Sequence, residues 1–162
     1  MQQNGDSDVK TKVIRDIPIS ENGIIRISNK EYRGRPYTDL RLFQGALEDD
    51  VKYAPSIQGV LIEGELLGEV IEGFRHAKNK PSAKFPEGAY QHRTTAHDCF
   101  ITEWDIYRFY KLYRDGNYYI EIRKMTIDNE RKWKPYIRKG AVIEMRFADQ
   151  VIEGLEQAKQ IR

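Results

Sequence analysis

The sequence predicts an α+β fold made of two tandem ββββα modules, each an antiparallel sheet with a C-terminal helix, packed as an intrachain pseudo-dimer through the helices. Two observations lead to this prediction. The block Val70–Lys78 recurs as Val151–Lys159, which is an offset of 81 residues. In each copy, alternating apolar residues, typical of half-buried strands, precede an apolar stripe with helical spacing. A repeat of this length decides how the rest of the chain is divided.

The repeat extends beyond the helices. A one-residue slip aligns Asp39–Arg41 with Glu121–Arg123, which we attribute to a longer turn in the second copy. We therefore divide the chain into a disordered tail at 1–12, a first repeat at 13–78, a linker at 79–98 and a second repeat at 99–162. The offset of 81 also relates these residues: Gly59 with Gly140, Ile62 with Ile143, Glu63 with Glu144, and Tyr32 with Tyr113.

In the first copy, strands are expected at 24–31 and 37–44, joined by a turn at 33–36 whose Gly and Pro suit a reversal. A short strand around Tyr53 and another at 59–63 follow. The helix begins near Glu65, because apolar residues then recur at i, i+3 and i+4.

In the second copy, a strand-like run at 101–114 leads to a hairpin signal at 115–117. Strands follow at 118–125 and within 133–143, and then the second helix. Glycines 73 and 154 interrupt the two helices at matching places, and the simplest reason is close approach of another helix. Separate modules on a string are the alternative. A module of about 60 residues is marginal alone, so mutual packing is preferred.

Composition narrows the class of protein. The net charge is +2, so affinity for a polyanion must come from local basic stripes. A mean hydropathy of −0.71 and the lack of a long apolar run indicate a soluble protein without a membrane span. No apolar secretory signal opens the chain. The single cysteine excludes an intrachain disulfide. We expect an intracellular protein, cytoplasmic or at the nucleoid, or nuclear.

Several short motifs resemble one family. Tyr32–Arg35 followed by Thr38–Arg41 resembles the β-finger and next strand of the transcriptional coactivator positive cofactor four, and Ile120–Arg123 resembles that strand again. Lys134–Gly140 looks like the family's basic loop. The resemblance covers roughly 24–78 and 105–162. It implies a single-stranded DNA-binding protein with weak sequence preference that acts in transcription, replication or repair. The Whirly and PUR proteins have related folds.

The residues themselves suit such a ligand, because a single strand is bound by a cationic groove with aromatic platforms. By resemblance, the finger supplies an aromatic residue and cations, the following strand one cation, and the loop three. The family's aromatic residue after the second strand is replaced by Gln44 and Thr126, and the first copy lacks the basic loop. The candidate residues are Tyr32, Arg33, Arg35, Tyr37, Arg41, Phe43, Tyr113, Arg114, Tyr119, Arg123, Trp133, Lys134, Tyr136, Arg138 and Lys139.

Other readings remain open. A PUR-like RNA-binding protein would use the same surface. A protein-interaction scaffold would use the acidic loop at 48–50 and the helices. Transcription or replication proteins are the expected protein partners, and the pseudo-dimer could pair further. No phosphate-binding or dinucleotide motif is present, and His97–Cys99 lacks partners at metal-ligand spacing. We therefore expect neither an enzyme, nor a cofactor, nor a metal.

Overall fold

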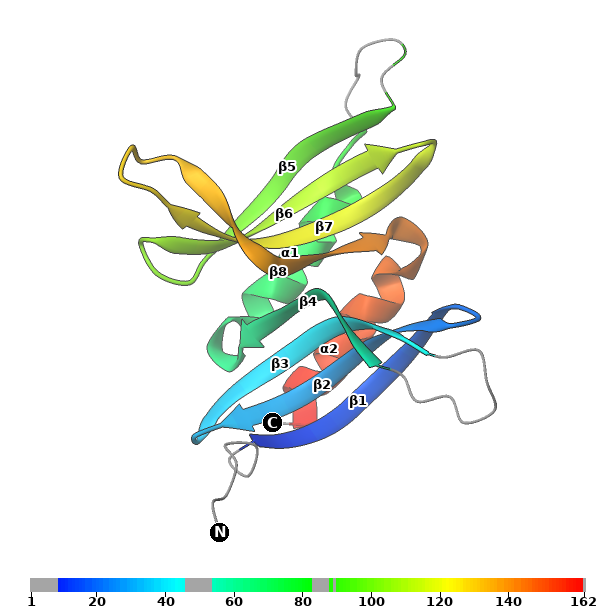
Figure 1. Ribbon diagram of the computed structural model, residues 1–162, viewed down its shortest axis with the longest axis vertical. Coiled ribbons are helices and arrows are strands. Elements are labelled where there is room, and N and C mark those ends of the chain that lie inside the picture. Colours follow the sequence, from blue (N-terminus) through cyan, green and yellow to red (C-terminus); the bar gives the residue numbers. More distant parts are fainter. Residues whose placement is uncertain (1–8, 46–53, 83–87, 89, 162) are drawn as a thin grey trace.

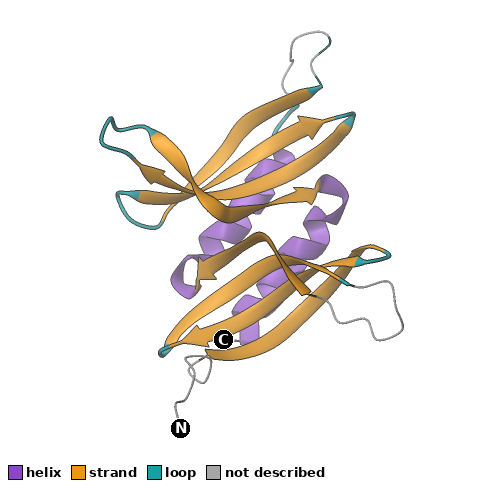
Figure 2. Ribbon diagram, in the orientation of Figure 1, coloured by secondary structure: helices purple, strands orange, loops and turns teal. Residues whose placement is uncertain are grey.

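The computed structural model describes residues 9–45, 54–82, 88 and 90–161. All of the strands join one antiparallel sheet of eight strands in the order β1-β2-β3-β4-β8-β7-β6-β5, and both helices lie on one face of it (Figures 1 and 2). The first half contains β1 (Val9–Ser20), β2 (Gly23–Tyr32), β3 (Arg35–Gln44), β4 (Ala54–Glu63) and α1 (Leu67–Asn79). The second half contains β5 (Gln91–Phe100), β6 (Asp105–Arg114), β7 (Asn117–Ile127), β8 (Trp133–Glu144) and α2 (Ala148–Ile161).

The α+β class agrees with the sequence. Each half has four strands and then a helix, but these are not the four strands predicted, because β1 and β5 were not expected. The prediction of a separate sheet for each module is wrong, because β4 and β8 pair edge to edge through Gly59 and Gly140. These two glycines are also partners in the sequence repeat. The two halves therefore meet at equivalent positions, and the line between them divides one continuous sheet.

Several predicted boundaries differ from the structure. Residues 9–12 belong to β1 and residues 91–98 to β5, so neither segment is tail or linker. Residues 101–104 form the turn before β6 and do not extend its strand. Residues 54–63 form the single strand β4. The expected strand at Tyr53, the acidic loop at 48–50 and residues 1–8 of the tail lie outside the described residues.

The two halves are interlocked through their helices. Helix α1 packs mainly on β5 and β6 of the second half, whereas α2 packs on β1 and β2 of the first half, and the helices also contact each other. A Cβ atom on Gly73 would lie 2.3 Å from the Phe109 ring, and one on Gly154 would lie 2.5 Å from Ile27. The helical glycines therefore allow close approach to strands of the other repeat, and the predicted helix–helix reason is wrong.

The β2–β3 and β6–β7 hairpins have turns of equal length. Arg33 and Gly34 have φ of 49° and 77°, and Asp115 and Gly116 have φ of 49° and 84°. Two residues with positive φ are typical of a tight hairpin turn. The longer second turn predicted above is therefore wrong. Because Gly34 and Gly116 are equivalent, an offset of 82 relates β2 and β3 to β6 and β7, whereas Gly59 and Gly140 keep the offset of 81.

Alternation along the strands defines the two faces of the sheet. Core residues such as Ile25, Ile27 and Leu40 are fully buried beneath the helices. Their sequence neighbours Arg26 and Arg41 point to the opposite side, since successive side chains of a strand alternate. Neither α1 nor α2 covers that side, which we call the open face. Neither helix combines the length and apolar character needed to cross a membrane.

Candidate nucleic-acid interface

One row of side chains crosses the open face from edge to edge. Cross-strand register aligns one residue from every strand, and the residue types are the same when read from either end. Carboxylates stand at both ends, glycines in the centre and two arginines between them on each side. We call this the arginine row: Asp16, Arg26, Arg41, Gly59, Gly140, Arg123, Arg108 and Asp98.

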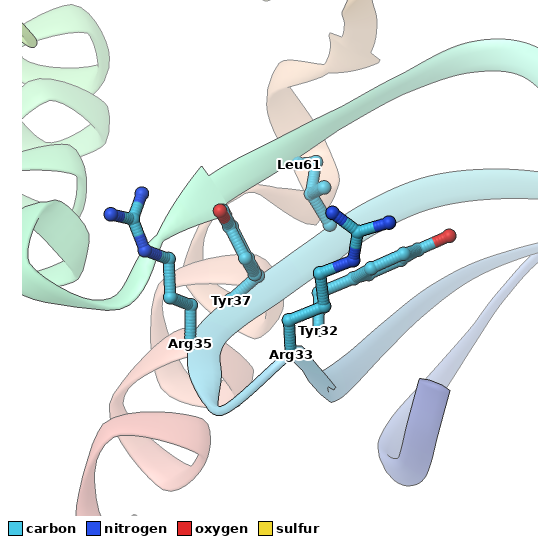
Figure 3. A pocket seen from close by; sticks show the side chains of 5 residues that line it. All are labelled: Tyr32, Arg33, Arg35, Tyr37 and Leu61. Carbon is cyan, nitrogen blue, oxygen red and sulfur yellow. The ribbon is translucent and has the colours of Figure 1, made fainter. Parts of the chain in front are cut away.

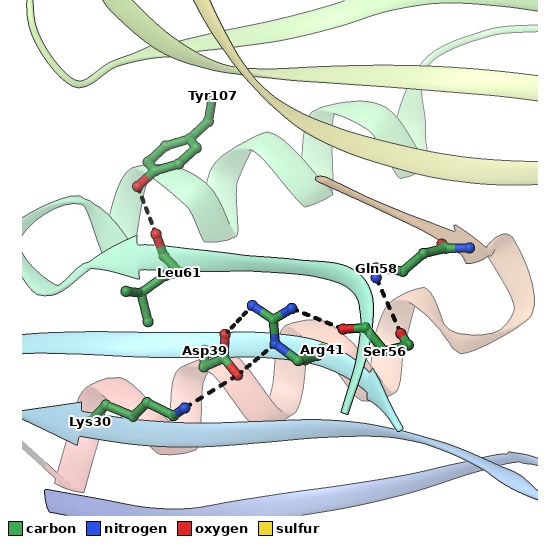
Figure 4. Close-up of polar contacts among 7 residues, drawn as sticks. All are labelled: Lys30, Asp39, Arg41, Ser56, Gln58, Leu61 and Tyr107. Atoms are coloured by element: carbon green, nitrogen blue, oxygen red, sulfur yellow. Dashed lines mark hydrogen bonds and ion pairs between the residues drawn. The ribbon is translucent and has the colours of Figure 1, made fainter. Parts of the chain in front are cut away.

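The inner arginines are held by buried acids. Arg41 donates from Nε and Nη2 to Asp39, at 3.2 Å each, and from Nη1 to the Ser56 carbonyl at 3.1 Å (Figure 4). Asp39 is only 3 % exposed, and Lys30 approaches it at 3.9 Å. A guanidinium has five N–H donors, so two remain for a ligand. The side chain of Arg41 stays 24 % exposed.

The second half repeats this arrangement. Arg123 contacts Glu121, which is 3 % exposed, through Nε and Nη2 at 3.1 Å. Arg93 on β5 donates to the other oxygen of Glu121 at 2.7 Å. A Cβ on Gly59 would lie 2.5 Å from Arg41 Cζ, and one on Gly140 would lie 2.8 Å from Arg123 Cζ. The central glycines thus let both inner arginines lie flat against the sheet.

The outer arginines combine a carboxylate with an aromatic ring. Arg26 forms two hydrogen bonds to Asp16 at 2.7 and 2.9 Å, and its Cζ lies 4.8 Å from the centre of the Phe43 ring. Arg108 forms two with Asp98 at 2.8 and 2.9 Å, which raises the pKa of its guanidinium above the usual value. A bidentate pair fixes the plane of the guanidinium, so these donors are already oriented.

A groove of about 730 Å³ occupies the open face of the first half. Four cations surround the one carboxylate in its lining, and Phe43 forms part of its wall. One of the cations, Arg138, belongs to β8 of the second half. The groove is therefore shared by both repeats, although the first has no basic loop of its own. Its lining is Thr11, Val13, Arg26, Ser28, Lys30, Asp39, Arg41, Phe43, Pro55, Ser56, Ile57 and Arg138.

The β2–β3 finger forms a second pocket of about 560 Å³ beside the groove. Tyr32, Arg33, Arg35 and Tyr37 surround it with Leu61, and Figure 3 shows Arg33 and Arg35 on opposite sides of Tyr37. Tyr32 is 46 % exposed, and no acid lines the pocket. All four finger candidates from the sequence therefore lie together.

The second finger differs from its predicted role. Tyr113 is four residues after the core residue Phe109 on β6, so both point to the helix side of the sheet. The centre of its ring lies 5.3 Å from that of Tyr118. The pairing of Tyr113 with Tyr32 is therefore wrong, because the local offset of 82 makes Arg114 the counterpart of Tyr32. Arg114 lies 5.9 Å from the centre of the Tyr119 ring.

Further candidates lie around the β7–β8 loop, and they differ in how far they are engaged by other residues of the fold. Lys134 pairs with Asp128 at 3.1 Å and stays 66 % exposed. Tyr136 donates its hydroxyl hydrogen to Asp105 at 2.8 Å, with Lys124 and Lys139 each 5.1 Å from its ring centre. Tyr136 is thus partly engaged in the fold, whereas the cations around it remain at the surface.

Sequence reasoning missed Arg26, Lys30, Arg93 and Arg108. The signal was available, because Asp16 with Arg26 recurs as Asp98 with Arg108 at an offset of 82. An offset of 81 does not align these two pairs.

The single cysteine of the chain lies in the core. Cys99 is 1 % exposed, and burial, aided by a hydrogen bond to Glu69, raises its pKa to about 12. Within the described ranges, no three metal-ligating side chains gather as a metal site would require.

Comparison with known proteins finds similarity among solved structures. No protein-family model matches this chain, and no curated protein does. Among solved structures, the chain is similar to BPSL1147, a PC4 homolog from Burkholderia pseudomallei K96243, at 40 % identity. The tetragonal form matches with a TM-score of 0.39, covering 43 % of this chain and all of that one. The orthorhombic form gives the same score and identity and is covered to 92 %. The comparisons thus make this chain similar to a PC4 homologue over 43 % of its length.

Proposed function

We propose that this protein binds single-stranded DNA on the open face of its sheet, with weak sequence preference and without catalysing a reaction. The observation that carries the proposal is the shared groove, where Arg26, Lys30, Arg41 and Arg138 surround the single carboxylate of Asp39. Cations that follow a nucleic-acid backbone release its counterions and supply affinity. The finger pocket, with two more arginines and no acid, continues this surface.

Aromatic rings beside these cations favour unpaired bases over a duplex. Tyr32 and Tyr37 line the finger pocket, and Phe43 lines the groove. Tyr32 is exposed and the other two rings are half-buried, so each offers at least part of its face to a base that is not already stacked within a double helix. The resemblance to the positive-cofactor-four family implies the same ligand. In this proposal the two repeats act as a pseudo-dimer within one chain.

The biological setting belongs to the same proposal. A protein of this kind would act inside the cell, in the cytoplasm, the nucleoid or the nucleus, wherever transcription, replication or repair exposes single strands. Its protein partners would be transcription or replication proteins.

The test uses variants that remove an ion pair without leaving a buried charge. Replacing Arg41 alone would leave Asp39 without its main partner and destabilise the fold. The double variant Asp39→Asn with Arg41→Gln, and the matching Glu121→Gln with Arg123→Gln, keep the net charge and remove the guanidinium. Lys159→Gln, on α2, is the control.

Binding of a labelled oligonucleotide, followed by fluorescence anisotropy, should weaken about tenfold in each double variant, which corresponds to about 1.4 kcal/mol. The control should bind as the unmodified protein does. Unchanged affinity in both double variants, with unchanged melting curves, would refute the proposed surface. Competition by unlabelled single-stranded RNA and duplex DNA distinguishes the two kinds of ligand. Stronger competition by RNA than by single-stranded DNA would favour the RNA-binding alternative. Absence of oligonucleotide binding even at low salt would support a protein-interaction scaffold.

A further inference from the structure

The far end of the second repeat carries three aromatic rings that the groove and the finger do not use. Phe100 and Trp104 are 59 % and 61 % exposed, unusually open for side chains of this size. Trp133 packs edge-on against Phe100 with ring centres 6.5 Å apart. Arg108, in the arginine row, has its Cζ 6.0 Å from the Trp133 ring centre. We call these three rings the aromatic end.

The backbone around the aromatic end is fixed. The Trp104 carbonyl accepts a hydrogen bond from the Ile127 amide at 2.9 Å, and Ile127 is the cross-strand partner of Trp133. The Thr102 hydroxyl accepts from the amides of Trp104 and Asp105 at 3.1 and 3.2 Å. A ring on an ordered backbone loses little conformational entropy on binding, so the site is suited to a ligand with a flat face.

The aromatic end continues the cationic surface. Arg108 is the cross-strand neighbour of Arg123, and Arg123 lies over Gly140 at the centre of the sheet. From Arg26 to Arg108 the row crosses five strand intervals, about 24 Å at roughly 4.8 Å each. At about 3.4 Å per stacked nucleotide, roughly seven nucleotides reach from one outer arginine to the other. One single strand of this length can therefore place its phosphates along the arginine row and one of its bases on the aromatic end.

The two halves of the open face are not equivalent. By the offset of 82, Phe100 and Trp104 correspond to Pro18 and Asn22, so the first half has neither ring. The β2–β3 hairpin differs in the opposite sense. Three of its cations have no cationic counterpart in the second half, where Arg114 in turn replaces Tyr32. These cations and their counterparts are Lys30 with Leu112, Arg33 with Asp115, and Arg35 with Asn117.

We propose that Phe100, Trp104 and Trp133 form a stacking site for an unpaired nucleobase, and that this site makes the bound strand lie in one orientation. The inference rests on the proposed function. Backbone phosphates occupy the groove and finger of the first half, and a base near one end of the strand stacks at the second half. A strand has distinct 5′ and 3′ ends, so an asymmetric surface distinguishes them, whereas two identical halves would not.

The protein supplies its own reporter. Both of its tryptophans, Trp104 and Trp133, belong to the aromatic end. Stacking of a base should therefore quench most of the intrinsic tryptophan fluorescence. Anisotropy of a labelled oligonucleotide measures binding independently. A strand whose bases are replaced by abasic sites should still bind through its phosphates but leave the tryptophan fluorescence unchanged.

Orientation is tested with 2-aminopurine placed at the 5′ end or at the 3′ end of an otherwise identical oligonucleotide of about eight nucleotides. The emission of this base analogue should change on binding at one end only. The variant Phe100→Leu with Trp104→Leu should abolish that change and weaken binding several-fold, while Lys159→Gln preserves both. Binding without tryptophan quenching, or equal changes at both ends, would overturn the inference while leaving the proposed function intact. If the unmodified protein bound no oligonucleotide at all, the proposed function would be refuted instead.

Discussion

The two central glycines, Gly59 and Gly140, differ in the atoms that an added Cβ would meet. A Cβ on Gly59 would collide with the Arg41 side chain, which can adopt another rotamer. A Cβ on Gly140 would also lie 2.7 Å from the Ile122 carbonyl oxygen, which is part of the sheet backbone. Side chains can rotate away, but a paired strand can move only by bending the sheet.

Gly59→Ala should therefore cost about 1 kcal/mol of unfolding free energy, and Gly140→Ala about 2 to 3 kcal/mol, within the range for overpacked sites. Urea denaturation of the two variants measures both values. Gly59→Ala should in addition weaken oligonucleotide binding, because the Arg41 guanidinium must shift over the strand while it keeps its ion pair with Asp39. Equal stability losses, or a larger loss for Gly59→Ala, would contradict the geometry.

Cys99 leads to a second prediction at this scale. Only the thiolate reacts with disulfide reagents, and the pKa of about 12 keeps Cys99 protonated at pH 8. The folded protein should therefore react with Ellman's reagent far more slowly than the protein unfolded in guanidinium chloride, which should give one thiol per chain. Rapid, complete labelling of the folded protein would show that Cys99 is not buried as described.

Among the elements, the helices show an incomplete symmetry. Lys78 on α1 pairs with Asp149 on α2. The offset of 81 relates Lys78 to Lys159 and Asp149 to Gly68, and a Cβ on Gly68 would lie 3.1 Å from Lys159 Nζ. The equivalent of the Lys78–Asp149 pair therefore has its cation, Lys159, but has Gly68 in place of the acid.

Gly68→Asp should complete the second pair. It places a carboxylate in the first turn of α1, where the helix dipole favours it by about 0.3 to 1 kcal/mol. Compared with Gly68→Asn, which has the same size and no charge, it should stabilise the fold by about 0.5 to 1 kcal/mol. Thermal melts at low and high salt measure this difference, which salt should reduce. An aspartate variant less stable than the asparagine variant would contradict the proposed pairing.

The helices and strands differ in how well the sequence predicts them. Helices α1 and α2 and strands β2, β3 and β7 follow strong apolar periodicity or a glycine turn, and they were predicted. Strands β1 and β5 were missed because they are edge strands. Ile17 and Cys99 are their buried core positions, and β1 contains Pro18, which is unusual within a strand. Edge strands are half solvated, so their sequences resemble those of loops.

For the candidate site, the first finger, Arg41 and Arg123 were found from motif order. The arginine row was not, because it depends on cross-strand register over all eight strands, which no local pattern contains. The error at Tyr113 has the same origin. An offset wrong by one residue moves a strand side chain to the other face of a sheet.

On the scale of the whole molecule, each helix covers strands of the other repeat, so neither half can lose its structure alone. Tyr107 on β6 strengthens this connection by donating to the Leu61 carbonyl on β4 at 3.0 Å (Figure 4). The protein should therefore unfold in one cooperative transition. Tryptophan fluorescence, which reports on the second half alone, and far-UV circular dichroism, which reports on both, should give coincident melting curves. Two separated transitions would indicate independent modules.

The proposed function depends most on a cationic, ring-lined open face that takes up a single strand. The direct measurement is the affinity for a labelled single-stranded oligonucleotide over a range of salt concentrations, with the duplex of the same sequence alongside. Single strands should bind more tightly than the duplex. The slope of log affinity against log salt should be about −3 if four cations each contact a phosphate, at roughly −0.7 per contact. A slope near zero, or equal affinity for the duplex, would contradict it.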